Sequence, residues 1–504
     1  MVTVVSVLAD DFDSLARLAL RQAKLAEMVE LRMDRCGHPG EERLREFFQA
    51  CPRPAIVTVH GREGFGDFAG SQDERLGLLH AAARAGAGFV DIDRDSSVEL
   101  GEVEGRCSRI VSHHELDGTP ADLAALEESV RRYCYENDLV KLVTHANCAE
   151  DGVRMLRHLR GAPGLIGFCS GEAGSFTRVL APVFGSPFTY AAPMELPGEP
   201  AAPLTAPGQL RLNDLMAAWP PGGAGPGTAV FGVLGKPARH SWSPRLLGMA
   251  LKAARLDAVY LALEADDVDA FIQLADDENF RGFSVTAPFK EDALKLVAHA
   301  DDDCTQVRAL NTLVREGAGW RGRNTDVAAM RDAIEHALTM HGRKSGRPTH
   351  LGDARVLILG AGGAARAAVR GVRGSVRTTV AARRLERAEL VARELGVYAI
   401  DWNAIPNEEY DVLVHCTPAG SNSDPGTLVI PADWIRPDSL VFDAVYRPVR
   451  TPLLLAARKR KCTMVPGGEW FVRQAASQFH HFTGQEPDNA LLRSTFHSLV
   501  EEDA

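Results

Sequence analysis

The stretch Arg355-Val-Leu-Ile-Leu-Gly-Ala-Gly-Gly-Ala-Ala-Arg-Ala367 joins an apolar run, a glycine-rich turn and an alanine-rich segment. This order predicts a buried strand, a tight turn and a helix, which together open a Rossmann-like unit. The free N–H groups at the start of that helix can bind the pyrophosphate of a dinucleotide. A glycine-rich turn is a weak signal by itself, and here the flanking strand and helix support the interpretation. The turn contributes the candidate cofactor-binding residues Gly360, Ala361, Gly362, Gly363 and Ala364.

The residues after the next predicted strand indicate which dinucleotide binds. About 20 residues beyond such a turn, these folds carry an acid for a ribose hydroxyl or an arginine for a 2′-phosphate. This chain has no acid at that strand end and carries Arg383, Arg384 and Arg387 instead. Three guanidinium groups favour NADPH over NADH as the cofactor.

The length of 504 residues is too great for one ordinary core and predicts several domains. Residues 218–228 read Ala-Trp-Pro-Pro-Gly-Gly-Ala-Gly-Pro-Gly-Thr, a composition typical of a linker. The polar stretch 341–353 is predicted to be a loop. We therefore expect a domain over 1–216, a linker over 217–228, an α/β domain over 229–338, the Rossmann-like domain over 339–450, and C-terminal helices over 451–504 that pack on the domain over 229–338.

Composition and charge exclude several classes of function. The net charge of -11 argues against nucleic-acid binding. None of the nine cysteines forms a Cys-x-x-Cys pair, so neither a metal site nor a redox motif is predicted. The first residues lack a basic segment and are expected to form a strand, not a signal peptide. No apolar run approaches the length of a membrane span, so we expect a cytoplasmic protein.

Residues 1–216 alternate predicted strands with helical stretches. Eight strand–helix units predict a (β/α)8 barrel, in which chemistry takes place at the carboxyl ends of the strands. Glu30, Arg32, His114, Lys141 and Arg178 fall within or just after the predicted strands, so we expect them near that mouth. The predicted strands are 2–8, 27–33, 55–60, 88–93, 109–112, 139–144, 164–168 and 186–192.

Lys141 is the most informative residue of this half because it lies within the apolar segment Leu139-Val-Lys-Leu-Val. A buried ammonium group is costly, so such a lysine is paired, neutral or functional. A lysine of lowered basicity is a nucleophile that forms an imine with a ketone. The ordinary alternative is a lysine that reaches solvent from the strand end. A histidine in the preceding unit, in Ser112-His-His-Glu, can move protons near neutral pH.

Further polar residues in this half suit a ligand that carries a carboxylate. Glu30 and Arg32 share one face of their strand by period-two alternation. Arg178 follows Gly174-Ser-Phe-Thr, and the loop Thr205-Ala-Pro-Gly-Gln209 adds a hydroxyl and an amide. An arginine combined with small polar donors is well suited to a carboxylate.

Taken in order, these segments resemble type I 3-dehydroquinate dehydratase over residues 1–216. The matching segments are Glu30-Leu-Arg-Met-Asp, Val111-Ser-His-His-Glu-Leu, Leu139-Val-Lys-Leu, Phe176-Thr-Arg and Thr205-Ala-Pro-Gly-Gln. The resemblance implies that Lys141 forms an imine with the C3 ketone of 3-dehydroquinate. It also implies that His114 removes the C2 proton and helps the C1 hydroxyl leave, and that Glu63 orients His114. By the same resemblance, Arg178, Thr205 and Gln209 hold the substrate carboxylate, and Glu30 and Arg32 contact ring hydroxyls.

One segment departs from the family pattern. The family carries an arginine at the end of the third strand, in a Thr-x-Arg context, whereas this chain reads Thr58-Val-His60-Gly-Arg62-Glu63. His60 or Arg62 is expected to take that place. A neutral histidine cannot reproduce a bidentate guanidinium, so substrate affinity in this half is expected to depend on which of the two does so.

The second half carries polar motifs around another lysine. Ser241-Trp-Ser243-Pro places two hydroxyls near a predicted helix start, where they can bind a carboxylate or simply cap the helix. Lys290 follows a Thr-x-Pro turn and precedes a predicted helix over 291–299. Asp326, in Asn324-Thr-Asp, is its candidate acidic partner.

The complete set of motifs resembles shikimate dehydrogenase from about residue 231 to 484. The resemblance implies that Lys290 and Asp326 form the catalytic pair, with Lys290 donating a proton to the C3 oxygen. It implies that Ser241 and Ser243 bind the ring carboxylate, that Thr286, Asn311 and Gln474 contact ring hydroxyls, that Tyr446 lines the same cleft, and that Thr417 and Gly467 join the cofactor site. The motifs are Ser241-x-Ser-Pro, Val285-Thr-Ala-Pro-Phe-Lys, Leu310-Asn-Thr-Leu, Asn324-Thr-Asp, the glycine turn, Cys416-Thr-Pro-Ala-Gly, Asp443-Ala-Val-Tyr-Arg-Pro and Gln474-Ala.

Five positions depart from the usual pattern of this second family. Ser284, Ala382 and His415 stand where asparagine is usual, Arg384 replaces a threonine, and Trp470 replaces a methionine. The Ser284 form resembles the plant-type fused enzyme. None of the five belongs to the catalytic pair, so we expect them to adjust affinity and cofactor choice.

The whole chain therefore resembles the fused dehydratase–dehydrogenase of the shikimate pathway. This implies an α/β protein with an N-terminal (β/α)8 barrel, then a substrate domain and a Rossmann-like NADP domain. The expected partners are the small molecules 3-dehydroquinate, 3-dehydroshikimate and shikimate, with neither nucleic acid nor membrane. Two alternatives stay open: a quinate/shikimate dehydrogenase with an impaired barrel, and a non-catalytic sensor of pathway intermediates.

Overall fold

The computed structural model describes residues 2–61, 66–196, 198, 200–345 and 348–503. The chain divides into two compact units. Unit 1 comprises Met1–Val230 and Arg255–Phe280, and unit 2 comprises Phe231–Ala254 and Arg281–Ala504. Among the described helices, none combines the length and the apolar character needed to cross a bilayer.

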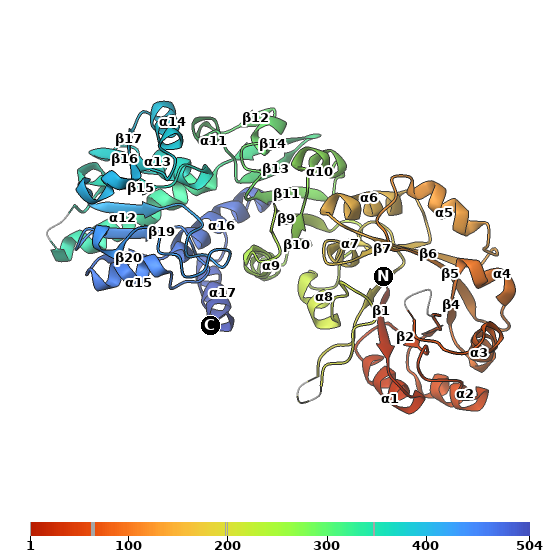
Figure 1. The fold of residues 1–504 in the computed structure, drawn as a ribbon. Helices are drawn as coiled ribbons and strands as arrows, with labels where there is room; N and C mark the ends of the chain where they lie inside the picture. Colours follow the sequence, from red (N-terminus) through yellow and green to blue (C-terminus); the bar gives the residue numbers. More distant parts are fainter. Residues whose placement is uncertain (1, 62–65, 197, 199, 346–347, 504) are drawn as a thin grey trace. The chain divides into compact units, whose positions relative to one another are not determined.

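Unit 1 contains a nearly closed barrel of eight parallel strands. The strands are hydrogen-bonded in the order β7-β6-β5-β4-β3-β2-β1-β8, and helices surround them (Figure 1). The predicted barrel is confirmed. Its strands are β1 (Val2–Leu8), β2 (Met28–Arg32), β3 (Ala55–Thr58), β4 (Phe89–Asp93), β5 (Ser108–Glu115), β6 (Leu139–His145), β7 (Leu165–Ser170) and β8 (Phe188–Ala191). The remaining elements of unit 1 are α1 (Phe12–Gln22), α2 (Glu41–Ala50), α3 (Gln72–Ala85), α4 (Ser97–Leu100), α5 (Leu123–Arg131), α6 (Ala149–Arg160), α7 (Phe176–Leu180), α8 (Leu212–Ala218), β10 (Ala258–Glu264) and α10 (Val268–Leu274).

Apolar side chains fill the barrel interior, and the alternation of side chains along each strand places polar residues in a separate layer. Val4, Met28, Ile56 and Ile110 belong to one buried apolar cluster. Two residues further along β5, Ser112 is in register with Lys141 of β6. Because side chains alternate across a strand, these polar residues point into the barrel one layer above its apolar filling. Strand β5 also runs beyond the predicted 109–112 to Glu115, so His114 belongs to the strand.

Unit 2 contains two sheets. The first has the order β9-β11-β13-β14-β12, and the second is parallel with the order β17-β16-β15-β18-β19-β20. The first sheet and its helices comprise β9 (Ala229–Gly235), α9 (Ser243–Ala253), β11 (Phe280–Val285), β12 (His299–Ala300), α11 (Asp302–Val307), β13 (Thr312–Glu316), β14 (Gly319–Arg323), α16 (Gly467–Thr483) and α17 (Asn489–Glu502). The second comprises α12 (Thr325–Ser345), β15 (Arg355–Leu359), α13 (Gly363–Gly371), β16 (Arg377–Ala381), α14 (Leu385–Leu395), β17 (Tyr398–Ile400), β18 (Val412–His415), β19 (Leu440–Asp443), α15 (Pro452–Lys459) and β20 (Thr463–Val465).

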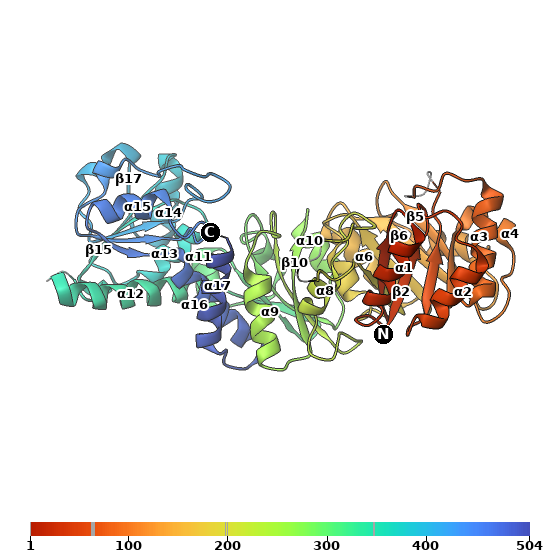
Figure 2. The ribbon, with the colours of Figure 1, turned by 90° about the horizontal axis from the view of Figure 1, so that it is seen from below.

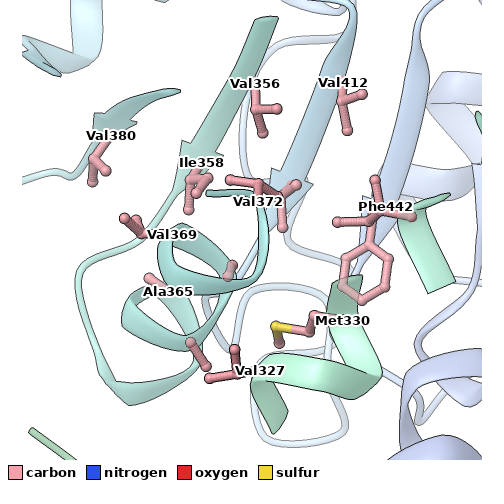
Figure 3. Close-up of a cluster of buried hydrophobic side chains, with 14 of the residues drawn as sticks. Val327, Met330, Val356, Ile358, Ala365, Val369, Val372, Val380, Val412 and Phe442 are labelled. Carbon is pink, nitrogen blue, oxygen red and sulfur yellow. The ribbon is translucent and has the colours of Figure 1, made fainter. Parts of the chain in front are cut away.

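The parallel sheet is apolar on both faces, as expected for a doubly wound unit. Val356 and Ile358 of β15 pack on one side against α12 and α13, represented by Met330 and Val369 (Figure 3). Leu357, between them in sequence, joins the cluster on the other face, which includes residues of α15. Figure 2 shows α12 running along one face of this sheet. The predicted strand, glycine turn and helix are confirmed, because Arg355–Leu359 leads through the turn into Gly363–Gly371.

Two local predictions in this unit are wrong. The predicted helix over 291–299 is a short 3-10 helix, Ala293–Leu296, followed by strand β12. Pairing of β12 with β14 takes His299, the last residue of the predicted range, out of the helix. The predicted loop over 341–353 begins instead as helix, because α12 continues to Ser345. No proline interrupts the helix before Pro348, and its apolar residues Met330 and Ile334 anchor it to the sheet.

The buried face of β15 leads to a first prediction. Ile358 is fully buried, so Ile358→Ala should lower the free energy of unfolding of unit 2 by about 2–5 kcal/mol. Urea unfolding followed by tryptophan fluorescence reports mainly on this unit, which holds Trp242, Trp320, Trp402, Trp434 and Trp470. The matched control is Val376→Ala, at a residue that is 63% exposed, and should change stability by less than about 0.5 kcal/mol. Equal effects of the two substitutions would contradict the assigned packing.

Candidate active sites

The carboxyl ends of the barrel strands surround a cavity in unit 1. Eight residues named from the sequence line it, so the structure brings these candidates together. Glu63 and Arg62, also named as candidates, lie outside the described residues. The predicted lining residues are Glu30, Arg32, His60, His114, Lys141, Arg178, Thr205 and Gln209, and the others are Val143, Phe168, Ser170, Tyr190, Ala206 and Pro207.

Lys141 is buried and paired with a carboxylate that the sequence analysis missed. Its Nζ donates to Asp91 Oδ2 at 2.6 Å, and Ser112 Oγ donates to Asp91 Oδ1 at 2.7 Å. The pair is 4% and 0% exposed, respectively, so neither charge is solvated by bulk water. The ammonium also lies 4.8 Å from the centre of the Tyr190 ring. The available signal for Asp91 was an acid inside the apolar strand Phe89-Val-Asp-Ile.

His114 is held in its neutral form. Burial lowers its pKa to about 3, and the positive charge of Lys141 acts in the same direction. Its ring meets that of His60 edge-on, with 5.2 Å between the ring centres. A neutral imidazole beside a buried lysine can accept a proton from a bound ligand at physiological pH.

His60, one of the two alternatives for the missing arginine, lies two residues beyond the end of β3 and lines the cavity. Its backbone N–H donates to Asp34 Oδ1 at 2.8 Å. Burial lowers the pKa of His60 well below its ordinary value, so the ring adds no charge to the site. Arg32 pairs with Asp34 across 2.5 Å and also donates to Thr205 O. Arg32 therefore supplies a fixed guanidinium to the same cavity.

The remaining predicted residues of the barrel cavity are Glu30, the Thr205–Gln209 pair and Arg178. Glu30 accepts hydrogen bonds from Ser6 and from Thr58, the latter at 2.7 Å. Thr205 Oγ1 lies 3.0 Å from Gln209 Oε1, so the loop hydroxyl and amide act together. Arg178 is buried, which lowers its pKa to about 10, and its guanidinium lies 4.2 Å from the centre of the Phe168 ring. The cavity thus combines cationic and neutral donors, which suits an anionic, hydroxylated ligand.

A second cleft lies within unit 2 and contains the predicted lysine and aspartate. Lys290 Nζ donates to Asp326 Oδ2 at 2.6 Å. Asn311 Nδ2 donates to the other carboxylate oxygen at 2.8 Å, and Asp326 lies in the first turn of α12. The Asp326 carboxylate is thus held from two sides, by the lysine and by the amide, at the N-terminus of a helix.

One face of α16 lines this cleft with residues at helical spacing. Trp470, Phe471, Gln474 and Gln478 all contribute. Gln478, which the sequence analysis missed, accepts from Ser284 Oγ at 2.7 Å and donates to the backbone oxygen of Asn311 at 3.1 Å. Its position four residues after the predicted Gln474 was the available signal.

The predicted carboxylate-binding hydroxyls lie at another part of the same cleft. Ser243 N–H donates to Ser241 Oγ at 3.2 Å and the two hydroxyl oxygens lie 3.1 Å apart, so both hydroxyls lie together at the start of α9. Tyr446 stacks on Phe471 with 4.3 Å between ring centres, and burial raises the pKa of its hydroxyl. Thr286 lines the cleft as well. The sequence therefore identified groups that converge, although they come from widely separated segments.

The predicted cofactor residues divide between the cleft and its surroundings. Ala364 and Thr417 line the cleft. Gly360, Ala361, Gly362, Gly363, Arg383, Arg384, Arg387 and Gly467 lie outside its lining. Gly360 has φ +123°, and a Cβ there would lie 3.0 Å from the Cys416 backbone oxygen, so the turn requires glycine.

The donor set of this region fits a dinucleotide with a 2′-phosphate. A Cβ built on Gly362 meets no atom within 4 Å, so the start of α13 is open to a ligand. Arg383, Arg384 and Arg387 are exposed, and in the described part of the chain no ion pair engages their side chains. An open helix N-terminus beside free guanidinium groups provides donors for a pyrophosphate and a further phosphate.

His415, one of the departures noted above, belongs to a buried hydrogen-bonded chain. Its Nδ1 lies 2.8 Å from Asp443 Oδ1, and its Nε2 lies 2.6 Å from Thr417 Oγ1. Asp443 also accepts from Val445 N–H and from Thr451 Oγ1, at 3.0 and 2.5 Å. Hydrogen bonds to the Asp443 carboxylate therefore connect the end of β18 with the segment that follows β19.

Comparison with known proteins identifies the family. The family model for type I 3-dehydroquinase matches residues 3–219, and the model for the shikimate dehydrogenase substrate binding domain matches residues 233–313. The bifunctional 3-dehydroquinate dehydratase/shikimate dehydrogenase, chloroplastic, of Arabidopsis thaliana is 32% identical over 499 residues, covering 95% of this chain and 81% of the relative. The chain belongs to this bifunctional family. The resemblance seen in the sequence is confirmed.

Single-activity relatives match the second half of this bifunctional chain. A shikimate dehydrogenase (NADP(+)) of Syntrophobacter fumaroxidans is 33% identical over 285 residues, covering 55% of this chain and 96% of the relative. A solved shikimate dehydrogenase in complex with NADP+ is 27% identical, with a TM-score of 0.51, and covers 55% of this chain and 97% of that chain.

The buried His415–Asp443 contact generates a second prediction. His415→Leu leaves Asp443 with one hydrogen bond fewer in a fully buried position, so the free energy of unfolding should fall by about 1–3 kcal/mol. His415→Asn retains a polar donor and should lower the free energy of unfolding by a smaller amount. Urea unfolding of the two variants provides the measurement. If the leucine variant were as stable as the asparagine variant, the contact would carry no net stabilisation.

Proposed function

We propose that this chain catalyses two successive steps: dehydration of 3-dehydroquinate to 3-dehydroshikimate in unit 1, and reduction of that product to shikimate with NADPH in unit 2. The observation that carries the proposal is that each cavity contains a lysine held 2.6 Å from a buried carboxylate, among donors for an anionic hydroxylated ligand. A cytoplasmic location is part of the proposal and rests on the sequence alone.

In the barrel, the chemistry begins with attack of Lys141 on the C3 ketone. The amine must first lose a proton, and Asp91 Oδ2 is its hydrogen-bonded acceptor. Loss of water forms an imine, which draws electrons from the ring and acidifies the C2 proton. His114 removes that proton and returns it to the C1 hydroxyl, which leaves as water. A weakly basic imidazole is sufficient because the imine has made C2–H acidic.

Other barrel residues orient the substrate in this proposal. Arg178, Thr205 and Gln209 bind its carboxylate, and Glu30 and Arg32 bind ring hydroxyls. Hydrolysis of the product imine then frees Lys141. Glu63 keeps its proposed role of orienting His114, and that role rests on the family resemblance.

In unit 2, Lys290 donates a proton to the C3 oxygen of 3-dehydroshikimate. Asp326 holds the ammonium, and Asn311 fixes Asp326 from the other side. Ser241 and Ser243 bind the ring carboxylate beside Tyr446. The hydroxyls contact Thr286, Asn311 and Gln474. The nicotinamide, when bound, supplies the hydride.

The arginines near the start of α14 and the names of the relatives both support NADP as the cofactor. Gly360–Gly363, Ala364, Thr417 and Gly467 would hold its pyrophosphate and nicotinamide half. The two alternatives, an NAD-dependent quinate/shikimate dehydrogenase and a sensor, gain no specific support. The four proposed reacting residues, Lys141, His114, Lys290 and Asp326, are all present in the sequence. No acid replaces Arg383.

The two sites can be tested separately in one coupled assay, which is the third prediction. Wild-type protein given 3-dehydroquinate and NADPH should form shikimate with equal loss of NADPH. Lys141→Met should abolish this reaction but still reduce added 3-dehydroshikimate, because only the imine-forming amine is lost. Lys290→Met should accumulate 3-dehydroshikimate, with reduction slowed about 100-fold or more through loss of the proton donor.

Controls at exposed lysines complete this design. Lys24→Met in unit 1 and Lys459→Met in unit 2 should leave both rates unchanged. Borohydride added with 3-dehydroquinate should trap a covalent adduct in the wild type and none in Lys141→Met. Folded wild-type protein that yields neither product nor adduct would refute the barrel assignment.

The arginine cluster provides a fourth prediction. Joint replacement of Arg383, Arg384 and Arg387 by serine should raise the KM for NADPH about 10–100-fold, through loss of charged hydrogen bonds to the 2′-phosphate. The KM for NADH, which lacks that phosphate, should change little. Arg393→Ser, on the exposed surface of the same helix, is the matched control. An equal loss for both cofactors would contradict a 2′-phosphate contact.

A further inference from the structure

Tyr190 of β8 carries a buried hydroxyl without a hydrogen-bond partner. The residue is 3% exposed, and its Oη contacts no donor or acceptor within the described part of the chain. Buried polar groups are almost always hydrogen-bonded, because an unpaired one loses its contacts with water and gains nothing in return. Tyr190 also lines the barrel cavity. A bound ligand is therefore the natural partner for this hydroxyl.

The carboxylates nearest to Tyr190 do not serve as that partner. Glu30 and Asp91 both act on its pKa, which burial above all raises well beyond the ordinary value, so the hydroxyl stays protonated and can donate. Each of the two carboxylates already accepts two hydrogen bonds. The donors are Ser6 and Thr58 to Glu30, and Ser112 and Lys141 to Asp91.

Arg178 lies beside Tyr190 and has an unused donor of its own. Its Nη1 donates to the backbone oxygen of Tyr190 at 3.5 Å, and its Nε, like the tyrosine hydroxyl, has no partner among the described residues. The Phe168 ring packs against both side chains, 4.2 Å from the guanidinium and 5.5 Å from the tyrosine ring. Two buried donors whose residues line the same cavity, one of them cationic, suit a carboxylate, which can accept from both.

We propose that Tyr190 donates a hydrogen bond to the carboxylate of the cyclic hydroxy acid bound in the barrel, next to Arg178. The proposal deepens the dehydratase function and rests on it. Arg178 supplies the charge, and Tyr190 supplies a neutral donor whose position is fixed by the strand that carries it. The hydroxyl gains this partner only when the ligand is bound, so it acts on affinity for the substrate.

The decisive variant is Tyr190→Phe, which removes the hydroxyl and keeps the ring. We expect the KM for 3-dehydroquinate to rise about tenfold or more, because a hydrogen bond to a charged group is lost, while kcat stays close to wild type. Thermal stability without ligand should be unchanged or higher, because an unpaired buried group has been removed. Tyr133→Phe, at an exposed residue of the same unit, should change neither quantity. An unchanged KM combined with lower stability would overturn the proposal and assign the hydroxyl to the resting fold.

A binding measurement identifies the group that Tyr190 contacts. Quinate lacks the C3 ketone and cannot form an imine, so calorimetry reports binding alone. Wild-type protein should bind quinate more tightly than quinate methyl ester. The Tyr190→Phe substitution should weaken the binding of quinate about tenfold and should change the binding of the methyl ester little. Equal losses for acid and ester would overturn the carboxylate assignment. Failure of the dehydratase function itself would appear separately, as wild-type protein that forms no borohydride-trapped adduct with 3-dehydroquinate.

Discussion

Burial of the Lys141 ammonium against Asp91 is the interaction on which the barrel site depends. An isolated ammonium inside an apolar strand would be strongly destabilising, and a carboxylate 2.6 Å away compensates only if its remaining lone pairs are also engaged. Ser112 meets that requirement from the neighbouring strand. Because parallel pairing sets Ser112 beside Lys141, the register of the barrel determines whether the pair can exist at all. The strand register that forms the barrel therefore also brings Ser112 and Lys141 together around Asp91.

The apolar interior that surrounds this pair also surrounds its neighbours. Burial above all, and next the charge of Lys141, keeps His114 neutral, and burial keeps Tyr190 protonated. The site therefore holds an acceptor and a donor that do not change form near neutral pH. Arg178 retains its charge there, because burial lowers its pKa only to about 10. Such a cavity is organised before the ligand arrives, which reduces the reorganisation needed in the reaction.

The sequence predicted most of the architecture because its signals were local. Strand β1 and the turn after β15 were recognisable from apolar runs bounded by glycine or acidic residues. The helix expected over 291–299 is limited to a short 3-10 helix, and its last expected residue, His299, pairs instead with β14, a distant segment. Asp91 and Gln478 were missed for a related reason. Their importance lies in contacts across the fold, and an acid within a strand or an amide on a helix face has many ordinary explanations.

The two lysine–carboxylate pairs have the same length yet suit opposite roles, and their surroundings explain the difference. The Lys141 side chain is 5% exposed and Asp91 is fully buried beside it, so bulk water solvates neither group. In the proposed reaction this amine attacks the ketone, and Asp91 is the hydrogen-bonded group that can take its proton. The Lys290 side chain is 19% exposed, and the Asn311 amide and the first turn of α12 hold Asp326 from other sides. In the proposed reaction this more exposed lysine is the proton donor. The proposed nucleophile and the proposed acid thus come from the same kind of residue pair, and the two pairs differ in burial and in the groups that hold the carboxylate.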